Sequence, residues 1–289
     1  MDPSEILKKV RKIEIKTKGL SKHIFSGEYH SAFKGRGMSF SEVRAYHYGD
    51  DVRNIDWNVT ARTGDTHIKV FEEDRELTVM LMVDISRSSV FGSVNQFKSE
   101  LIAEISAVIA FSAITNNDKV GAILFSDQVE KYIPPKKGKK HILRIIREII
   151  FLEPESTGTD LETAMIYLSN IQKKKAIVFV LSDFMTQGYE AALSVASRRH
   201  DIIGMHIYDK MEKEMPNIGI IEAVDAETGK DIIIDTSSRS VRQKMSDWFS
   251  NNYDYYNDTF NRYRSDHLSI STQDDYVKLL LQFFKKRSA

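Results

Sequence analysis

The chain has 289 residues, enough for one large domain or two modest ones with a sizeable core. Lys+Arg and Asp+Glu are both 41, so a formal net charge of zero gives no global attraction to nucleic acid or to an anionic membrane. Cysteine is absent, which excludes a disulfide framework and a thiolate metal site. Because the formal net charge is zero, we expect no nucleic-acid partner.

The N-terminal residues, MDPSEILKKVRKIEIKTKGL, are charged and lack the apolar segment of a signal peptide. No apolar run approaches the ~20 residues that a membrane helix needs. The longest run, AIVFVL at 176–181, has the length of a strand. These features predict a cytoplasmic protein without membrane insertion.

The first 76 residues are expected to form a helix, over about 3–16, and a small β subdomain. The subdomain segment is rich in glycine, aromatic and charged residues, which favours short strands bounded by turns, most clearly at HIKVFEEDRE, 67–76. A later segment, 216–238, contains two short strands around a turn at Gly229. We expect this hairpin to leave the main sheet and to join the N-terminal strands.

From Leu77 the pattern alternates between strands and helices, so residues 77–289 are expected to form one α/β domain. The predicted strands are 77–84, 118–127, 128–135, 175–184, 201–209 and 267–272, and the predicted helices are 95–115, 139–152, 159–172, 188–200, 240–263 and 274–287. The second and third strands follow each other through a tight turn, which predicts that they are antiparallel. The alternation predicts a doubly wound, Rossmann-type, mostly parallel sheet with helices on both faces.

The first of these strands ends in an unusual way, in the segment ELTVMLMVDISRSSVFGS. Its apolar run, 79–83, ends on Asp84, and Ser86 and Ser88 follow at every second position. In extended backbone such positions face the same side, so one carboxylate and two hydroxyls would converge. A helix cap is the alternative, because Asp and Ser often cap helices.

Two further residues favour a metal site over a cap. Asp183 ends the strand 175–184, and Thr159 lies on a loop at the start of a helix. In open α/β sheets, ligands bind beyond the carboxyl ends of the strands. All of these groups are hard oxygen donors, which suit Mg²⁺ and also accept Mn²⁺ or Ca²⁺. We predict a metal site with the ligands Asp84, Ser86, Ser88, Thr159 and Asp183, and no catalytic residue.

The pattern D-x-S-x-S, then a G-T loop, then an Asp at a strand end resembles the metal-ion-dependent adhesion site of von Willebrand factor A domains. The resemblance implies that Asp84, Ser86 and Ser88 form the first ligand group, Thr159 the second and Asp183 the third. It also implies a von Willebrand factor A-like fold with an antiparallel third strand. YHYGDDVRNIDWNVTARTGDTHIKVFEEDRE and the later segments SDF and DAETGKDIIID resemble the bacterial family called domain of unknown function 58.

This resemblance implies a protein-binding role. Members of that family are commonly encoded beside MoxR-type AAA+ ATPases, so we expect an adaptor for such an ATPase in the assembly or maturation of protein complexes. An Asp or Glu of the partner would complete the shell of the metal ion.

Two other functions remain as alternatives. One is a metal-dependent phosphoesterase that uses Asp84, although such enzymes need an acid two residues later, where this chain has Ser86. The other is a scaffold whose metal site is vestigial.

A second cluster of charge, YGDDVRNIDW, has two interpretations. It contains Asp50, Asp51, Arg53, Asp56 and Trp57. An internal network of ion pairs and packing is favoured over a partner-docking surface, because Trp is mostly buried in proteins.

Overall fold

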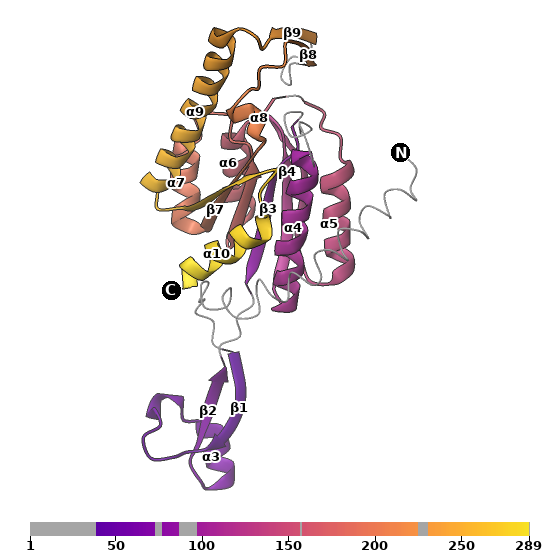
Figure 1. The fold of residues 1–289 in the computed structure, drawn as a ribbon. Coiled ribbons are helices and arrows are strands. Elements are labelled where there is room, and N and C mark those ends of the chain that lie inside the picture. Colours follow the sequence, from indigo (N-terminus) through magenta and orange to yellow (C-terminus); the bar gives the residue numbers. More distant parts are fainter. Residues whose placement is uncertain (1–38, 73–76, 87–96, 157, 225–230, 289) are drawn as a thin grey trace. The chain divides into compact units, whose positions relative to one another are not determined.

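The computed structural model describes residues 39–72, 77–86, 97–156, 158–224 and 231–288 (Figure 1). The helix expected over 3–16 lies outside this part of the chain. The chain divides into two compact units. The small unit is Phe33–Glu76, and the segment Leu77–Ala289 belongs to the other, which we call the sheet unit.

The small unit contains an antiparallel pair of strands with a helical connection between them. Its elements are β1 (Ser39–Ala45), a 3-10 helix η1 (Val52–Asn54), α3 (Trp57–Thr63) and β2 (His67–Glu72). The strand expected in 67–76 is present as β2, whereas the helix α3 was not predicted. Asp56 accepts hydrogen bonds from the backbone of Asn58 and Val59, and Gly64 ends the helix with a φ of 82°. These two caps enclose a seven-residue helix that periodicity could not reveal.

The charged cluster of this unit forms ion pairs, but its tryptophan is not buried. Arg44 holds Asp50 through two contacts of 2.8 Å, and Asp51 pairs with Arg53 at 2.8 Å. Trp57 is 70% exposed, so it does not pack into the core of the small unit, and packing of this cluster against the other unit stays a prediction.

The sheet unit is built on one six-stranded sheet. Its strands are β3 (Thr78–Asp84), β4 (Lys119–Phe125), β5 (Val129–Lys136), β6 (Ile177–Ser182), β7 (Asp201–Tyr208) and β10 (Asp266–Ser271). Their order is β10-β7-β6-β3-β4-β5. Each neighbouring pair is parallel except β4 and β5, which are antiparallel. The predicted mostly parallel sheet, with its antiparallel third strand, is confirmed.

Helices cover both faces of this sheet, as predicted. They are α4 (Lys98–Thr115), α5 (Lys139–Phe151), α6 (Leu161–Ile171), α7 (Glu190–Arg199), α8 (Lys210–Lys213), α9 (Arg239–Arg262) and α10 (Tyr276–Ser288). In Figure 1, α4 and α5 lie on one side of the sheet, and α6 and α7 lie on the other. The four-residue helix α8 was not predicted.

Alternate residues of the central strands face two different parts of the core. Met80 and Val178 belong to a buried cluster that also contains residues of α6, α7 and α9. Phe179, on the opposite face of β6, packs edge-on against Phe284 of α10, with ring centroids 6.2 Å apart. Burial on both faces explains why these strands are apolar at successive positions.

The hairpin of β8 (Ile220–Val224) and β9 (Asp231–Asp235) forms its own two-stranded antiparallel sheet, near one end of α9 (Figure 1). Its pairing with the N-terminal strands, and the domain division that includes it, stay predictions. In the part of the chain that the structure describes, no helix is both long and apolar enough to span a membrane.

Candidate metal centre

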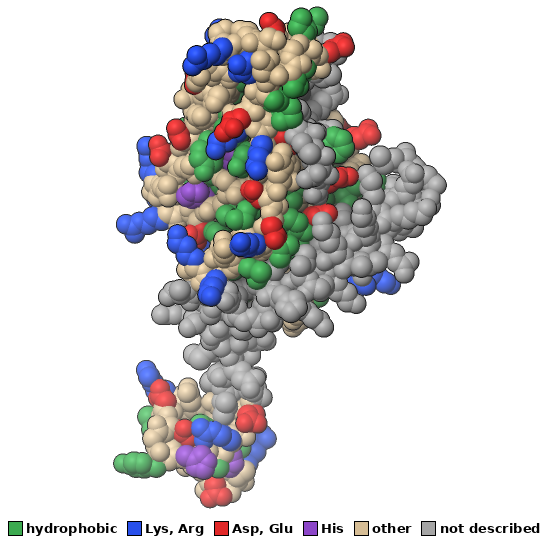
Figure 2. All heavy atoms as spheres, viewed as in Figure 1, with side chains coloured by type: hydrophobic (Ala, Val, Ile, Leu, Met, Phe, Trp, Pro, Cys, Tyr) green, Lys and Arg blue, Asp and Glu red, His purple; other side chains and the backbone are tan. Residues whose placement is uncertain are grey.

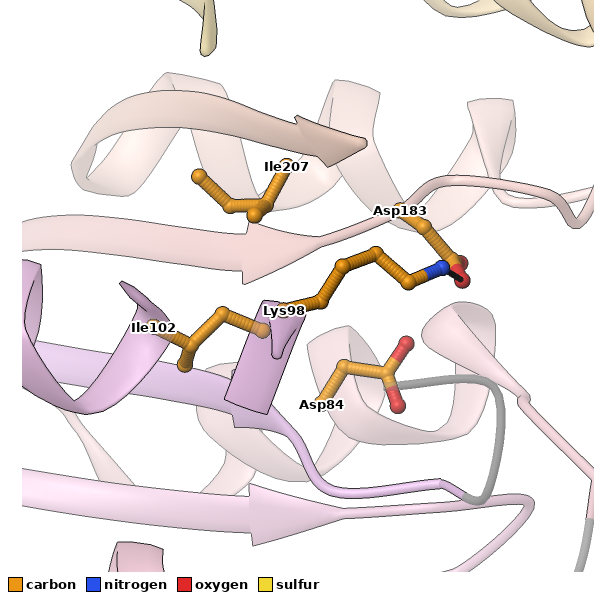
Figure 3. A pocket seen from close by; sticks show the side chains of 5 residues that line it. All are labelled: Asp84, Lys98, Ile102, Asp183 and Ile207. Carbon is orange, nitrogen blue, oxygen red and sulfur yellow. Dashed lines mark hydrogen bonds and ion pairs between the residues drawn. The ribbon is translucent and has the colours of Figure 1, made fainter. Parts of the chain in front are cut away.

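The two predicted carboxylate ligands lie at the carboxyl ends of neighbouring strands. Asp84 ends β3 and Asp183 follows β6, and β3 and β6 are paired in parallel, with Val83 opposite Leu181. Both aspartates are buried, and both line one pocket together with Lys98, Ile102 and Ile207 (Figure 3). The β3–β6 pairing therefore brings together two aspartates that are 99 positions apart in the sequence.

Asp84 is held by neutral donors. Its Oδ1 accepts a hydrogen bond from the backbone N–H of Ser86 at 2.9 Å, and its Oδ2 accepts one from the hydroxyl of Ser182 at 2.6 Å. The Ser86 hydroxyl also hydrogen-bonds to this carboxylate. The strand ends at Asp84 and the chain bends at Ser86, so the expected extended alternation does not continue through Ser86. Ser86 instead folds back onto Asp84 in an Asx-type turn.

Burial and, to a smaller extent, the negative charge of Asp183 raise the pKa of Asp84 to about 6. The hydrogen bonds from Ser182 and Ser86 oppose this shift. A raised pKa in a buried acid pair indicates a site that is short of positive charge.

The chain turns sharply where it leaves β6. Phe184 is buried, yet its backbone is left-handed, with a φ of 50°. The Ser182 hydroxyl accepts a hydrogen bond from the Phe184 N–H at 3.0 Å, and the Met185 N–H donates to Asp183 Oδ1 at 3.3 Å. A bulky residue in this conformation is strained, and such strain often lies beside functional groups.

Asp84 and Ser86 do not cap the next helix that the structure describes. That helix, α4, has Phe97 at its N-cap and no side-chain capping bond. Residues 87–96 lie outside the described part of the chain, so the capping alternative is excluded for α4 alone. Ser88 lies outside the described residues.

Thr159 lies on a loop near the same end of the sheet. It is half-buried and precedes Asp160, whose side chain caps α6. The backbone N–H of Asp160 donates to the carbonyl of Ser126, directly after β4, at 2.8 Å. Thr159 is not among the residues that line the pocket of Asp84 and Asp183. The five-residue ligand set stays a prediction.

The sequence analysis missed a buried cation at this site. The Lys98 side chain is 1% exposed, and its Nζ lies 3.0 Å from Asp183 Oδ2 and 2.6 Å from Glu212 Oε1. Figure 3 shows this ammonium reaching the Asp183 carboxylate, beside Asp84. Burial lowers the pKa of Lys98, but the charges of Asp183 and Glu212 outweigh burial and raise it above its ordinary value. One signal was available: Lys98 is the first residue of α4, where the helix dipole disfavours a cation.

Glu212 was missed because it lies on the short helix α8. It forms a capping box with Asp209, whose backbone N–H donates to Glu212 Oε2 at 2.8 Å. Asp209 in turn accepts a hydrogen bond from the Thr272 hydroxyl at 2.7 Å. Glu212 is thus a positioned carboxylate with one oxygen on the backbone and the other on Lys98.

The chemistry of the predicted ligands fits a hard divalent ion. Two carboxylates, with hydroxyl groups around them, supply the oxygen ligands that Mg²⁺ prefers. No group of three or more His, Cys, Asp or Glu side chains in the described residues is arranged to hold an ion. An ion held by Asp84 and Asp183 would therefore need hydroxyls, water or a partner's oxygen to complete its shell.

Comparison with known proteins places the chain in a family. The family described as "Protein of unknown function DUF58" matches residues 42–252. The uncharacterized protein Rv1480 of Mycobacterium tuberculosis is 28% identical over 232 residues, covering 79% of this chain and 73% of that protein.

Two solved structures are similar at low sequence identity. The conserved hypothetical protein BatB of Bacteroides thetaiotaomicron is 15% identical, with a TM-score of 0.47 over 73% of this chain and 98% of that one. An aerotolerance-related membrane protein of Bacteroides fragilis is 16% identical, with a TM-score of 0.49 over 73% of this chain and 99% of that one. The family match covers well over half of the chain, which therefore belongs to the DUF58 family of proteins of unknown function.

Proposed function

We propose that this protein is a non-enzymatic interaction module that binds a protein partner through a divalent metal ion. The observation that carries the proposal is the burial of Asp84 and Asp183 in one pocket at the carboxyl ends of β3 and β6. Two carboxylates leave a divalent ion electrophilic enough to accept a third from a partner, and Mg²⁺ commonly keeps positions for such ligands.

The surface of the chain supports a protein partner rather than a polyanion. Acidic and basic side chains are interspersed over the described surface on the face that Figure 2 shows. The formal net charge is zero, which gives no general attraction to nucleic acid.

The partner that we propose is a MoxR-type AAA+ ATPase in the cytoplasm. Membership of the DUF58 family supports this choice, because the family resemblance implies such a neighbour. In this arrangement the ATPase does the chemistry, and the present chain recognises the protein that is assembled or matured.

We also propose that the chain does not catalyse phosphoester hydrolysis. A nucleophilic Asp84 would need an acid two residues later to protonate the leaving group, and Ser86 stands there with its backbone and hydroxyl bonded to Asp84. Turnover of p-nitrophenyl phosphate by the Mg²⁺-loaded wild type, lost in Asp84→Asn, would contradict this part of the proposal.

Calorimetric titration of the metal-stripped protein with Mg²⁺ and with Mn²⁺ tests the metal site. We expect saturable binding to the wild type and its loss in Asp84→Asn and Asp183→Asn. A matched control is Asp118→Asn, because Asp118 is also a buried aspartate but precedes β4, at the opposite end of the sheet, where it binds the Leu77 N–H at 2.9 Å. Asp118→Asn should bind metal like the wild type.

Partner binding requires a separate measurement. Pull-down of a purified MoxR-type AAA+ ATPase by the wild type should depend on Mg²⁺ and should fail in EDTA. Equal capture with and without EDTA would favour the scaffold with a vestigial site.

A further inference from the structure

Lys98 places a positive charge where the candidate metal site needs one. Its side chain is 1% exposed, and its ammonium lies 3.0 Å from Asp183, one of the two carboxylates of the site. The pocket that Asp84 and Asp183 share is lined by this same lysine (Figure 3). A buried ammonium is retained only where carboxylates compensate its lost hydration.

We propose that Lys98 is a counter-cation that pairs with Asp183 and Glu212 when no metal is bound. When a divalent ion binds, the Lys98 ammonium leaves Asp183 and pairs with Glu212 alone. The proposal rests on the proposed function, because it concerns the same metal site.

The geometry around Glu212 carries this assignment. Glu212 Oε1 is already 2.6 Å from the Lys98 ammonium, so the lysine can release Asp183 and keep a charged partner. Glu212 Oε2 is bound by the backbone N–H of Asp209 at 2.8 Å, which holds the carboxylate in place. Lys98 has rotatable bonds along its whole stem, so a small rotation moves the ammonium without moving α4.

The charges give opposite effects for the two side chains. A divalent ion on Asp183 is repelled by a neighbouring ammonium, so removal of Lys98 should tighten metal binding. Without the Glu212 charge, the Lys98 ammonium keeps its contact with Asp183 among the described residues and competes there with the ion, so metal binding should weaken. A residue that only supports the fold would not give this pair of opposite signs.

The test is calorimetric titration of Mn²⁺ into metal-stripped full-length protein carrying Lys98→Met or Glu212→Gln. We expect Lys98→Met to bind at least about tenfold more tightly than the wild type, and Glu212→Gln at least about tenfold more weakly. The matched control is Lys131→Met, which breaks the Lys131–Glu148 contact of 2.9 Å on β5 and α5 and should leave the affinity unchanged.

Thermal unfolding shows whether the Lys98→Met variant is folded, so that a change in its metal affinity is not confused with a loss of folding. Lys98→Met leaves Asp183 and Glu212 without their shared cation, so the metal-free variant should melt below the wild type. Saturating Mn²⁺ should raise its melting temperature by more than it raises that of the wild type.

The outcomes separate this inference from the proposed function. Metal binding to Lys98→Met that is tighter than to the wild type, or present when the wild type binds none, supports the inference. Metal binding to the wild type that is unchanged or weakened in Lys98→Met overturns the inference and leaves the metal site standing. Absence of binding in both proteins overturns the inference and the proposed metal dependence together.

Discussion

The sheet unit and the small unit bury their side chains to different extents. In the sheet unit, residues 79–83 of β3 are completely buried, and α4 is buried along almost its whole length. In the small unit, Ile68 is the one buried hydrophobic side chain among those that the structure describes, while Trp57 is 70% exposed.

The difference shows two ways of holding a chain together. The sheet unit is held by tight apolar packing, and it encloses charged groups such as Lys98 and Asp183. The small unit relies on hydrogen bonds and ion pairs at its surface, such as the Asp56 cap and the Arg44–Asp50 contact. Packing energy grows with buried apolar area, whereas exposed ion pairs contribute little. We therefore expect substitutions in the sheet unit to have the larger effects.

The largest effect on the free energy of unfolding is expected where buried rings pack directly against the backbone of the sheet. A Cβ on Gly204 of β7 would lie 2.5 Å from Cε1 of Phe260 and 3.0 Å from Cε2 of Tyr256, both on α9. The rings are buried and cannot move aside, so Gly204→Ala should lower the free energy of unfolding by about 3 kcal/mol. Urea denaturation measures this loss.

Gly158→Ala is the control, because its Cβ would meet no atom nearer than 3.5 Å. Equal stability of both variants would contradict tight packing of the Phe260 and Tyr256 rings on β7.

A smaller effect is expected from a buried histidine of the sheet unit. Burial lowers the pKa of His206 to about 3, while the charge of Asp183 opposes the shift and that of Lys98 adds to it. In the unfolded chain His206 has its ordinary pKa of 6.5, so between pH 6.5 and pH 3 the unfolded state alone binds this proton. The free energy of unfolding should therefore fall by about 1.4 kcal/mol per pH unit as the pH drops through this window.

His206→Phe removes this proton-binding group. Its stability relative to the wild type should rise by about 2 kcal/mol between pH 6.5 and pH 5, as measured by urea denaturation of both proteins at each pH. Comparison at each pH cancels the titration of other groups. Parallel pH curves for the two proteins would argue against a neutral, buried His206.

The smallest effect on the free energy of unfolding is expected from the loss of a helix cap, which can be tested in each of the two units. Asp56 caps α3 through bonds of 3.0 and 3.2 Å to the Asn58 and Val59 N–H groups, and Asp160 caps α6 through a bond of 3.0 Å to the Thr163 N–H. Loss of either cap costs about 1 kcal/mol. Asp160→Ala should lower the global free energy of unfolding by about this amount.

Asp56→Ala should act locally instead. Hydrogen exchange of the α3 amides should become faster, while the urea transition of the sheet unit stays unchanged. A shift of that transition by Asp56→Ala would mean that the two units unfold as one, and the contrast between them would not hold.

Much of the sheet unit could be predicted because its elements obey local rules. Strand β3 is buried on both faces, so its run 79–83 had to be apolar at successive positions. The short connection from β4 to β5 allowed only an antiparallel return. Helices α3 and α8 were missed because they have seven and four residues, too few for a hydrophobic period to repeat.

The sequence by itself determined that Asp84 ends one buried strand and that Asp183 directly follows another, because an apolar run followed by a carboxylate marks the point where a buried strand reaches solvent or a ligand. Only the tertiary structure decided that Lys98 joins them. Lys98 lies 85 positions from Asp183 and 114 positions from Glu212, and no local pattern relates residues that far apart. The packing of α4 on the sheet brings its first residue to the ends of β3 and β6, where two carboxylates offset the desolvation of its charge.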